Sequence, residues 1–198
     1  MKTIRAIVYD CDGMLVHEER FSHRLEALYD ISTDRTQDFF KNSFQLCLVG
    51  KADLREELSK LLDIWGWKGS VDELLSFWLS PEHNTVDERF RTIVAEQRAR
   101  GLKAYMATNN EKYRSKNLIE DTKLGEWFDG TFSSSSLGVK KPDSEFYNLI
   151  ADAITVSKDE VIFWDDDAGH VEAAKAEGYI AELYSDLDSF KARMRALS

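Results

Sequence analysis

Apolar runs and helical spacing alternate along most of the chain. Branched and aromatic residues cluster in five short segments, which predict buried strands at residues 4–9, 102–110, 128–132, 161–164 and 179–183. Between them, apolar residues recur every three or four positions, which predicts helices. These helices cover residues 86–100, 111–121, 171–176 and 187–197, and one more follows residue 143. The alternation indicates an α/β fold, built as a Rossmann-like, doubly wound parallel sheet.

Residues 17–85 follow a different pattern, with little strand signal. Apolar residues fall on one face of four predicted helices, most clearly in the leucine-rich segment 54–65. Ser70 and Glu73 form a capping-box pattern, which predicts the start of the last of these helices. We therefore expect a four-helix bundle inserted into the α/β core. The predicted domains are a core of residues 1–16 and 86–198 and an inserted helical domain of residues 17–85.

Reactive side chains follow the predicted strands at four places. They are Asp10 and Asp12, Thr108 and Asn109, Lys141, and Asp165 and Asp166. Because the carboxyl ends of parallel strands meet at one edge of a sheet, we expect these groups to converge. Two close carboxylates repel each other unless a cation lies between them, and Mg²⁺ prefers such oxygen ligands. One carboxylate could attack a phosphorus atom while the other transfers a proton. A plain acidic turn is the alternative for residues 10–13.

Charge and composition narrow the choice of partner. The 198 residues carry a formal net charge of −10, which disfavours nucleic acid and anionic membranes as partners. No apolar run approaches the ~18 residues of a membrane span, so we expect a cytoplasmic location. The two cysteines, Cys11 and Cys47, are expected to be reduced thiols. An anionic substrate would need a local cation to offset the acidic surface.

The ordered set of reactive segments resembles the four motifs of the haloacid dehalogenase (HAD) superfamily. Residues 10–15, DCDGML, are similar to the first motif, DxDGxL, and residues 106–109, MATN, to the second. Lys141 followed by Pro142 resembles the third motif, and residues 163–166, FWDD, the fourth in its paired-acid form. The inserted helical domain is similar to the family's type 1 cap. Among members, the chain most resembles small sugar-phosphate phosphatases.

The resemblance implies a role for each reactive group. Asp10 would be the nucleophile that forms an aspartyl-phosphate, and Asp12 the general acid and base. Thr108 and the backbone amide of Asn109 would bind the phosphoryl oxygens. Lys141 would offset negative charge on the nucleophile and the phosphate. The implied Mg²⁺ ligands are Asp10, the backbone carbonyl of Asp12, and Asp166, with Asp165 assisting.

Other positions are assigned less specifically by the same resemblance. Lys51 lies in the mid-cap turn that reaches the substrate in type 1 caps, and a solvated lysine is the alternative. His17 stands where an Asp often follows the first motif, and His170 where Asn is common after the paired acids. A substrate contact and a structural role are both open for these histidines. Asp167 is expected to be a charge at a helix N-terminus, and Cys11 a small filler between two functional residues.

These observations predict a Mg²⁺-dependent phosphatase, a monomer or homodimer, that hydrolyses a small phosphorylated metabolite such as a sugar phosphate. A phosphomutase would keep all four motifs and would differ only in transferring the phosphoryl group back to a bound sugar. A 2-haloacid dehalogenase is disfavoured because such members lack the second acid, Asp12. A catalytically retired binding module is disfavoured because it would have no need for so many uncompensated charges.

Overall fold

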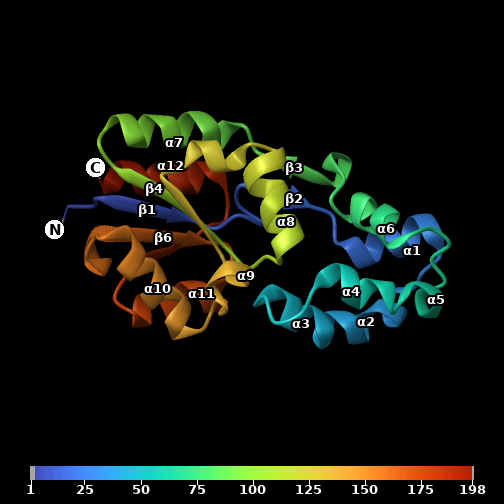
Figure 1. Cartoon of the computed structure of the whole chain (residues 1–198). Coiled ribbons are helices and arrows are strands. Elements are labelled where there is room, and N and C mark those ends of the chain that lie inside the picture. The colour runs from blue at the N-terminus through green and yellow to red at the C-terminus, as the bar shows by residue number, and fades with distance from the viewer. Residues whose placement is uncertain (1–2, 198) are drawn as a thin grey trace.

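A five-stranded parallel sheet forms the centre of one half of the molecule in the computed structural model, which describes residues 3–197 (Figure 1). The strand order is β5-β4-β1-β6-β7, and every neighbouring pair is parallel. The α/β prediction is confirmed, because each strand falls on a predicted apolar run. The strands are β1 (Ala6–Tyr9), β4 (Lys103–Thr108), β5 (Gly130–Ser133), β6 (Val161–Asp165) and β7 (Ile180–Leu183).

Helices cover both faces of this sheet. Helices α7 (Arg89–Ala99) and α12 (Leu187–Ala196) lie on one face, and α10 (Ser144–Ile154) and α11 (Ala168–Ala176) lie on the other. Shorter helical turns complete the connections: α8 (Lys112–Lys116), a π-helix at Asn117–Asp121, α9 (Ser134–Leu137), and 3₁₀ turns at Leu124–Trp127 and Lys158–Glu160. Both faces of the sheet are therefore buried, as parallel sheets require.

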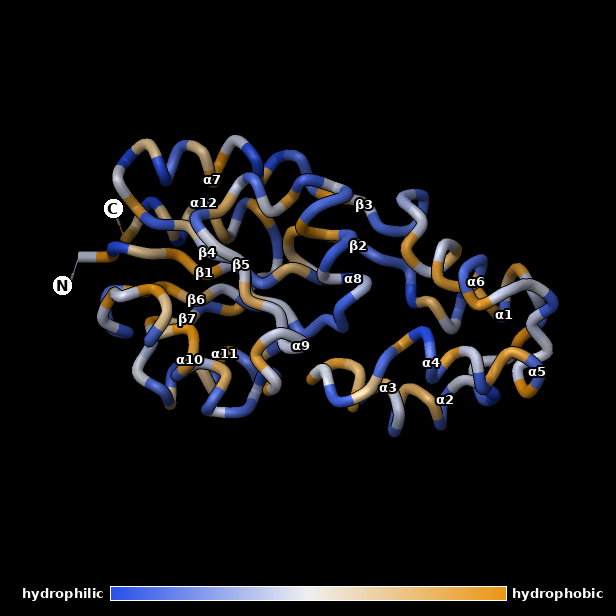
Figure 2. Tube along the Cα trace, viewed as in Figure 1, coloured by the Kyte–Doolittle hydropathy of each residue, from blue (hydrophilic) through white to orange (hydrophobic). Residues whose placement is uncertain are grey.

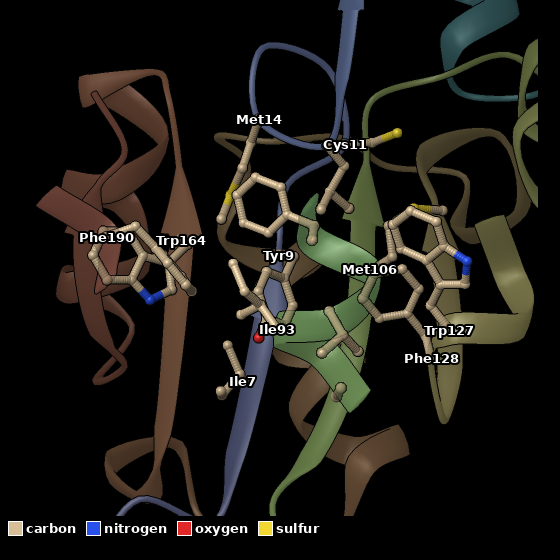
Figure 3. Close-up of a cluster of buried hydrophobic side chains, with 14 of the residues drawn as sticks. Ile7, Tyr9, Cys11, Met14, Ile93, Met106, Trp127, Phe128, Trp164 and Phe190 are labelled. Atoms are coloured by element: carbon tan, nitrogen blue, oxygen red, sulfur yellow. The ribbon is translucent and has the colours of Figure 1, made fainter. Parts of the chain in front are cut away.

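Alternate side chains of β1 enter two separate hydrophobic clusters. Ile7 and Tyr9 belong to the cluster under α7 and α12, whereas Ala6 and Val8 belong to the cluster under α10 and α11. Figure 3 shows the first cluster, in which Tyr9 lies among aromatic rings from several elements. Its ring centroid is 5.7 Å from that of Phe128. The hydropathy trace marks β1 and β6 as hydrophobic along the centre of this half (Figure 2).

A two-stranded antiparallel ribbon connects the sheet to the second half. It pairs β2 (Val16–Glu18) with β3 (Asn84–Val86), and Glu18 lies opposite Asn84. The ribbon was not predicted, because three residues per strand are too few to show an alternating pattern. The predicted domain boundaries at 16/17 and 85/86 pass through it. The division into two domains stays a prediction.

The second half, here called the helical half, contains six helices in place of the predicted four. They are α1 (Phe21–Tyr29), α2 (Thr33–Lys41), α3 (Ser43–Leu48), α4 (Leu54–Ser59), α5 (Leu62–Trp65) and α6 (Val71–Trp78), and a 3₁₀ turn at Pro81–His83 follows. The predicted number was wrong because two helices are interrupted. Asn42 leaves helical angles (φ −119°, ψ −86°) between α2 and α3. The amide of Leu61 donates a hydrogen bond to the carbonyl of Leu58, three residues earlier, and this tighter turn ends α4.

Aromatic residues form a separate core in the helical half. Its buried rings include Phe21, Phe39, Trp65 and Trp78. The predicted capping box is present, since the side chain of Ser70 binds the Glu73 amide and the side chain of Glu73 binds the Ser70 amide. Within residues 3–197, none of the helices has the length and apolar character needed to cross a bilayer.

Candidate active site

Lys141 joins two buried carboxylates at the carboxyl edge of the sheet. Its Nζ lies 2.7 Å from Oδ1 of Asp10 and 2.6 Å from Oδ2 of Asp165. Asp10 directly follows β1 and Asp165 ends β6, and these two strands pair in parallel. Burial opposes a charged ammonium, but the two carboxylates outweigh it and raise the pKa of Lys141 above its ordinary value. Lys141 is thus held as a cation beside Asp10.

Asp165 has partners on both of its oxygens. Besides the contact with Lys141, Oδ1 accepts a hydrogen bond from the Asp167 amide at 2.9 Å and lies 3.0 Å from Nδ1 of His170. Burial works against ionisation, but Lys141 and His170 hold the pKa of Asp165 below its ordinary value. Asp165 is therefore an ionised group that fixes the position of Lys141.

Asp166 completes a cluster of three carboxylates. Oxygens of Asp10, Asp165 and Asp166 lie within 4.8 Å of one another. Gly13 makes room for Asp166, because a Cβ at this residue (φ +79°) would lie 1.9 Å from Oδ2 of Asp166. The first motif therefore needs glycine at this position.

The charge of this cluster fits a divalent cation. Burial raises the pKa of both Asp10 and Asp166, and the negative charge of Asp165 raises both further. A cation between the carboxylates would favour their ionisation, and three ionised carboxylates beside the ammonium of Lys141 carry two net negative charges. Oxygen ligands at this spacing suit Mg²⁺, which is commonly bound by one or two carboxylates together with substrate phosphate.

Asp12 is bound by the segment that follows β4. Its Oδ2 accepts hydrogen bonds from Asn110 at 2.6 Å and from Thr108 at 3.5 Å. Its Oδ1 lies 2.5 Å from Nη2 of Arg114, a buried residue on α8. Thr108 is the last residue of β4, the strand beside β1. The side chains of the first and second motifs are therefore in direct contact.

Asn109 ties the second motif to the third. Its Nδ2 donates to the carbonyl of Lys141, and the Lys141 amide donates to its Oδ1, both at 2.9 Å. This pair of hydrogen bonds positions the loop that carries Lys141 against the end of β4. A lysine from an irregular segment can therefore reach Asp10 with a defined geometry.

Two cavities meet at these residues. The smaller has a volume of 460 Å³ and is lined by Asp10, Lys141 and Asp166, among others. The larger, of 620 Å³, lies between the sheet and the helical half. Four polar or charged residues line both cavities: Asp12, Glu18, Arg20 and Asn109. A phosphoryl group beside Asp10 would therefore leave the organic part of its ester in the larger cavity.

The structure does not bring Lys51 to this site. Its side chain is exposed and lines neither cavity. The turn that carries it packs against α9, where a Cβ at Gly50 would lie 2.5 Å from the carbonyl oxygen of Ser135. Arg20, which follows β2, lies at the junction of the two cavities instead. Among the described residues, Arg20 is the only basic residue that lines both cavities.

The remaining expected residues have distinct positions. His17 lines the smaller cavity, with Nε2 3.9 Å from Oδ2 of Asp87. His170 lines the same cavity while its Nδ1 faces Asp165. The prediction for Asp167 is confirmed, because its side chain accepts hydrogen bonds from the amides of residues 169 and 170 at the start of α11. Cys11 is fully buried in the hydrophobic cluster under α7 and α12, and burial raises the pKa of its thiol.

Four residues of the site were not predicted: Glu18, Arg20, Asn110 and Arg114. Two of them had a signal in the sequence, because Asn110 directly follows the second motif and Arg114 lies four residues further along a predicted helix. Glu18 and Arg20 had none, since their positions depend on the unpredicted ribbon.

Comparison with known proteins identifies the family. A sequence profile of haloacid dehalogenase-like hydrolases matches residues 4–178. The chain belongs to this family. It is 36% identical to the sesquiterpene phosphatase astK of Aspergillus oryzae, over 93% of this chain and 91% of that protein. It is 38% identical to a phosphatase of Mycobacterium tuberculosis, over 91% of this chain and 87% of that protein. The predicted HAD-type phosphatase is thereby confirmed at the level of enzyme class.

Solved structures of the HAD family share the fold. A HAD family enzyme from Bacteroides thetaiotaomicron superimposes with a TM-score of 0.86 at 15% identity, covering 98% of this chain and 100% of that one. The same enzyme has been solved as a magnesium complex, with a TM-score of 0.83, 17% identity and the same coverage. The L-2-haloacid dehalogenase of Xanthobacter autotrophicus gives a TM-score of 0.67 at 21% identity, over 98% and 83% of the two chains.

Proposed function

We propose that the protein is a Mg²⁺-dependent phosphatase that hydrolyses small phosphate monoesters through an aspartyl-phosphate on Asp10. The observation that carries this proposal is the contact of Lys141 with both Asp10 and Asp165, in a cluster that also contains Asp166. A fixed cation beside a carboxylate lets an anionic phosphate approach a nucleophile that would otherwise repel it. The phosphatase relatives support the same reaction.

In the first step, a carboxylate oxygen of Asp10 attacks the phosphorus atom. Oδ1 already accepts hydrogen bonds from Lys141 and from the Cys11 amide, both at 2.7 Å, so we assign the attack to Oδ2. The bond between phosphorus and the ester oxygen breaks, and Asp12 donates a proton to that oxygen as the alcohol leaves. The hydroxyl of Thr108 and the Asn109 amide bind the phosphoryl oxygens during the transfer.

In the second step, water attacks the phosphorus atom of the aspartyl-phosphate. Asp12, now ionised, accepts the proton from this water, and the bond between phosphorus and Asp10 breaks. Inorganic phosphate leaves and both carboxylates return to their starting state. In the free protein Asp10 and Asp165 both raise the pKa of Lys141, and the Asp165 carboxylate remains beside its ammonium after Asp10 is phosphorylated.

Asp10, Asp166 and the backbone carbonyl of Asp12 would hold the Mg²⁺, with Asp165 assisting through Lys141. The ion supplies positive charge that neutralises the phosphoryl oxygens and the attacking carboxylate. We further propose that residues 17–85 act as a cap, since residues of α1, α2, α3 and α6 line the larger cavity.

Assay of the purified protein against a panel of phosphate monoesters, with and without Mg²⁺, tests this function. We expect phosphate release that requires Mg²⁺ and that is absent from Asp10→Asn, because an amide is a poor nucleophile. Transfer to a second sugar hydroxyl, without release of phosphate, would indicate a phosphomutase instead. Release of halide from a 2-haloacid without any phosphatase activity would contradict the proposal.

A further inference from the structure

The larger cavity has an aromatic wall. Phe21, Phe40, Phe44 and Trp78 line it from the helical half, together with Leu48. The rings support one another: the centroids of Phe21 and Trp78 are 4.1 Å apart in a stacked pair, and those of Phe44 and Trp78 are 5.5 Å apart. None of these five residues lines the smaller cavity, whereas all four residues shared by both cavities are polar or charged. These five residues therefore form one apolar wall of the larger cavity, and polar or charged residues line the rest of it.

Two of the polar side chains that line this cavity have partners in the protein, whereas others, such as Lys41, are exposed to solvent. Gln45 donates to the carbonyl of Phe40 at 2.7 Å, and its Oε1 accepts from the ammonium of Lys140. Thr36 is fully buried and donates to the carbonyl of Thr33 at 2.9 Å. A sugar placed against this wall would bury hydroxyl groups opposite aromatic rings and satisfied side chains. Burying such groups without partners weakens binding.

From this aromatic wall we infer that the leaving group is apolar, so that the substrate is the phosphate ester of a hydrocarbon alcohol. This inference rests on the proposed phosphatase function. The phosphate lies beside Asp10, the ester oxygen lies near Asp12, and the carbon chain extends into the larger cavity along the aromatic wall. A volume of 620 Å³ lies within the range of pockets that bind ligands of drug size.

A homologous series of n-alkyl phosphates from ethyl to octyl tests this inference, with glucose 6-phosphate as the hydrophilic comparison. We expect kcat/KM to rise by roughly fourfold for each added methylene until the wall is covered. Phe44→Ser should flatten this rise, whereas Ile64→Ser, which removes an exposed apolar residue of the helical half, should leave it unchanged. A flat series, or higher kcat/KM for glucose 6-phosphate than for octyl phosphate, would overturn the inference. Absence of turnover with every monoester would instead refute the proposed function.

A second, independent observation concerns Arg114. Its guanidinium binds Asp12 at 2.5 Å, Glu18 at 2.9 Å and Oδ1 of Asn84 at 2.5 Å. Glu18 and Asn84 face each other on the two strands of the ribbon that leads to the helical half. One buried side chain therefore contacts the proton-transferring carboxylate and both linkers.

We propose that Arg114 is a positioning residue that couples the placement of the helical half to the orientation of Asp12. A displacement of the ribbon moves Glu18 and Asn84, and Arg114 transmits it to Oδ1 of Asp12. Proton transfer then occurs only when the helical half is correctly seated over the substrate. Seating of the helical half and protonation of the leaving alcohol would then occur together.

The leaving group provides the test, because p-nitrophenol departs without a proton whereas an alkyl alcohol needs one. We expect Arg114→Lys to lower kcat/KM, which covers the steps up to departure of the alcohol, at least tenfold more for octyl phosphate than for p-nitrophenyl phosphate. Glu18→Gln, which removes a carboxylate charge that contacts Arg114 directly, should show the same asymmetry in smaller degree. Arg55→Gln, which breaks an exposed ion pair with Asp72, serves as the control. Equal losses of kcat/KM on both substrates in Arg114→Lys would mean that Arg114 has only a structural role. Equal losses on both substrates in Glu18→Gln would refute the coupling to the ribbon.

Discussion

Lys141 lies 2.6 Å from Asp165, a carboxylate with no exposed surface, and this contact fixes the ammonium beside the nucleophile. The arrangement predicts that Lys141→Met lowers kcat by roughly 10²–10³-fold, since one preorganised charge at a reacting oxyanion has about that effect. Lys140→Met is the matched control, because it removes a neighbouring ammonium whose partner is Gln45 rather than a carboxylate. Circular dichroism would verify that both variants fold. More than a tenth of wild-type kcat in Lys141→Met would contradict the assignment.

Asp166 and Asp167 are adjacent but should differ in their effect on the metal. Asp166 belongs to the carboxylate cluster, whereas Asp167 caps α11. We expect Asp166→Ala to raise the Mg²⁺ concentration needed for half-maximal activity at least tenfold, in line with the loss of a charged ligand. Asp167→Ala should mainly lower the free energy of unfolding, by about 1 kcal/mol, through the lost cap. Titration of activity with Mg²⁺ and urea denaturation would measure the two effects. A larger effect of Asp167→Ala than of Asp166→Ala on the Mg²⁺ requirement would mean that the metal ligand of the fourth motif is Asp167.

Asp12→Asn should separate the two chemical steps. Attack by Asp10 on an aryl phosphate needs no proton donor, but breakdown of the aspartyl-phosphate needs a base. We expect the variant to accumulate labelled protein, with breakdown slowed by ~10²–10⁴-fold. Rapid quenching after mixing with a phosphorus-labelled aryl phosphate would detect the labelled protein. Asp10→Asn is the control, because it cannot form the aspartyl-phosphate and should stay unlabelled. Wild-type steady-state turnover in Asp12→Asn would remove this residue from the mechanism.

Arg20 and Lys51 give contrasting predictions for substrate binding. Arg20 lies where the two cavities meet, whereas Lys51 is exposed and lines neither. We expect Arg20→Gln to lower kcat/KM by roughly tenfold, the effect of losing one charge-assisted contact to an anion. Lys51→Gln should change kcat/KM less than twofold, which would confirm that the turn after α3 does not contact the substrate. A larger loss from Lys51→Gln would show that this turn moves over the site during turnover.

The ion pair of Asp87 with Arg89 should make part of the free energy of unfolding depend on pH. Its carboxylate lies 2.6 Å from Nη2 of Arg89, and this hydrogen bond holds the pKa of Asp87 below its ordinary value. A lowered pKa means that this stabilisation is present above the unfolded-state value of about 3.9 and is lost as the pH falls through the folded-state value. Asp87→Asn should therefore lower the free energy of unfolding by about 1 kcal/mol at pH 7.

The difference between wild type and Asp87→Asn should shrink as the pH approaches 3. Urea denaturation at several pH values would measure it, and Glu88→Gln, which alters an exposed neighbour, is the control. A difference that grows on acidification would show that Asp87 is not a stabilising anion.

The sheet and the catalytic edge could be predicted because both depend on local patterns. Apolar runs locate the five strands, and the parallel arrangement then brings Asp10, Thr108 and Asp165 together without any knowledge of loops. The role of Lys141 was assigned by resemblance, yet its position depends on hydrogen bonds between Asn109 and the Lys141 backbone, which cannot be read from the sequence.

The less predictable parts depend on contacts between distant segments. Six helices replace the predicted four because the hydrophobic stripe continues across each break in helical conformation. One such break is at Asn42, where the backbone leaves helical angles. The ribbon is too short to give a pattern, so the contacts of Arg114 with Glu18 and Asn84 could not be foreseen. Lys51 was assigned by analogy with the substrate loop of type 1 caps. In this chain the direction of the corresponding turn is set by the packing of Gly50 on α9.

The aromatic cluster of the helical half has a consequence for how such enzymes diversify. Its buried members all come from residues 21–78, and the two clusters on the sheet share none of them. Substitutions that reshape the wall around Phe44 can therefore accumulate without disturbing the strands that present Asp10 and Asp165. Duplicated copies of this chain could acquire new alcohols as substrates while inheriting the same phosphoryl chemistry unchanged.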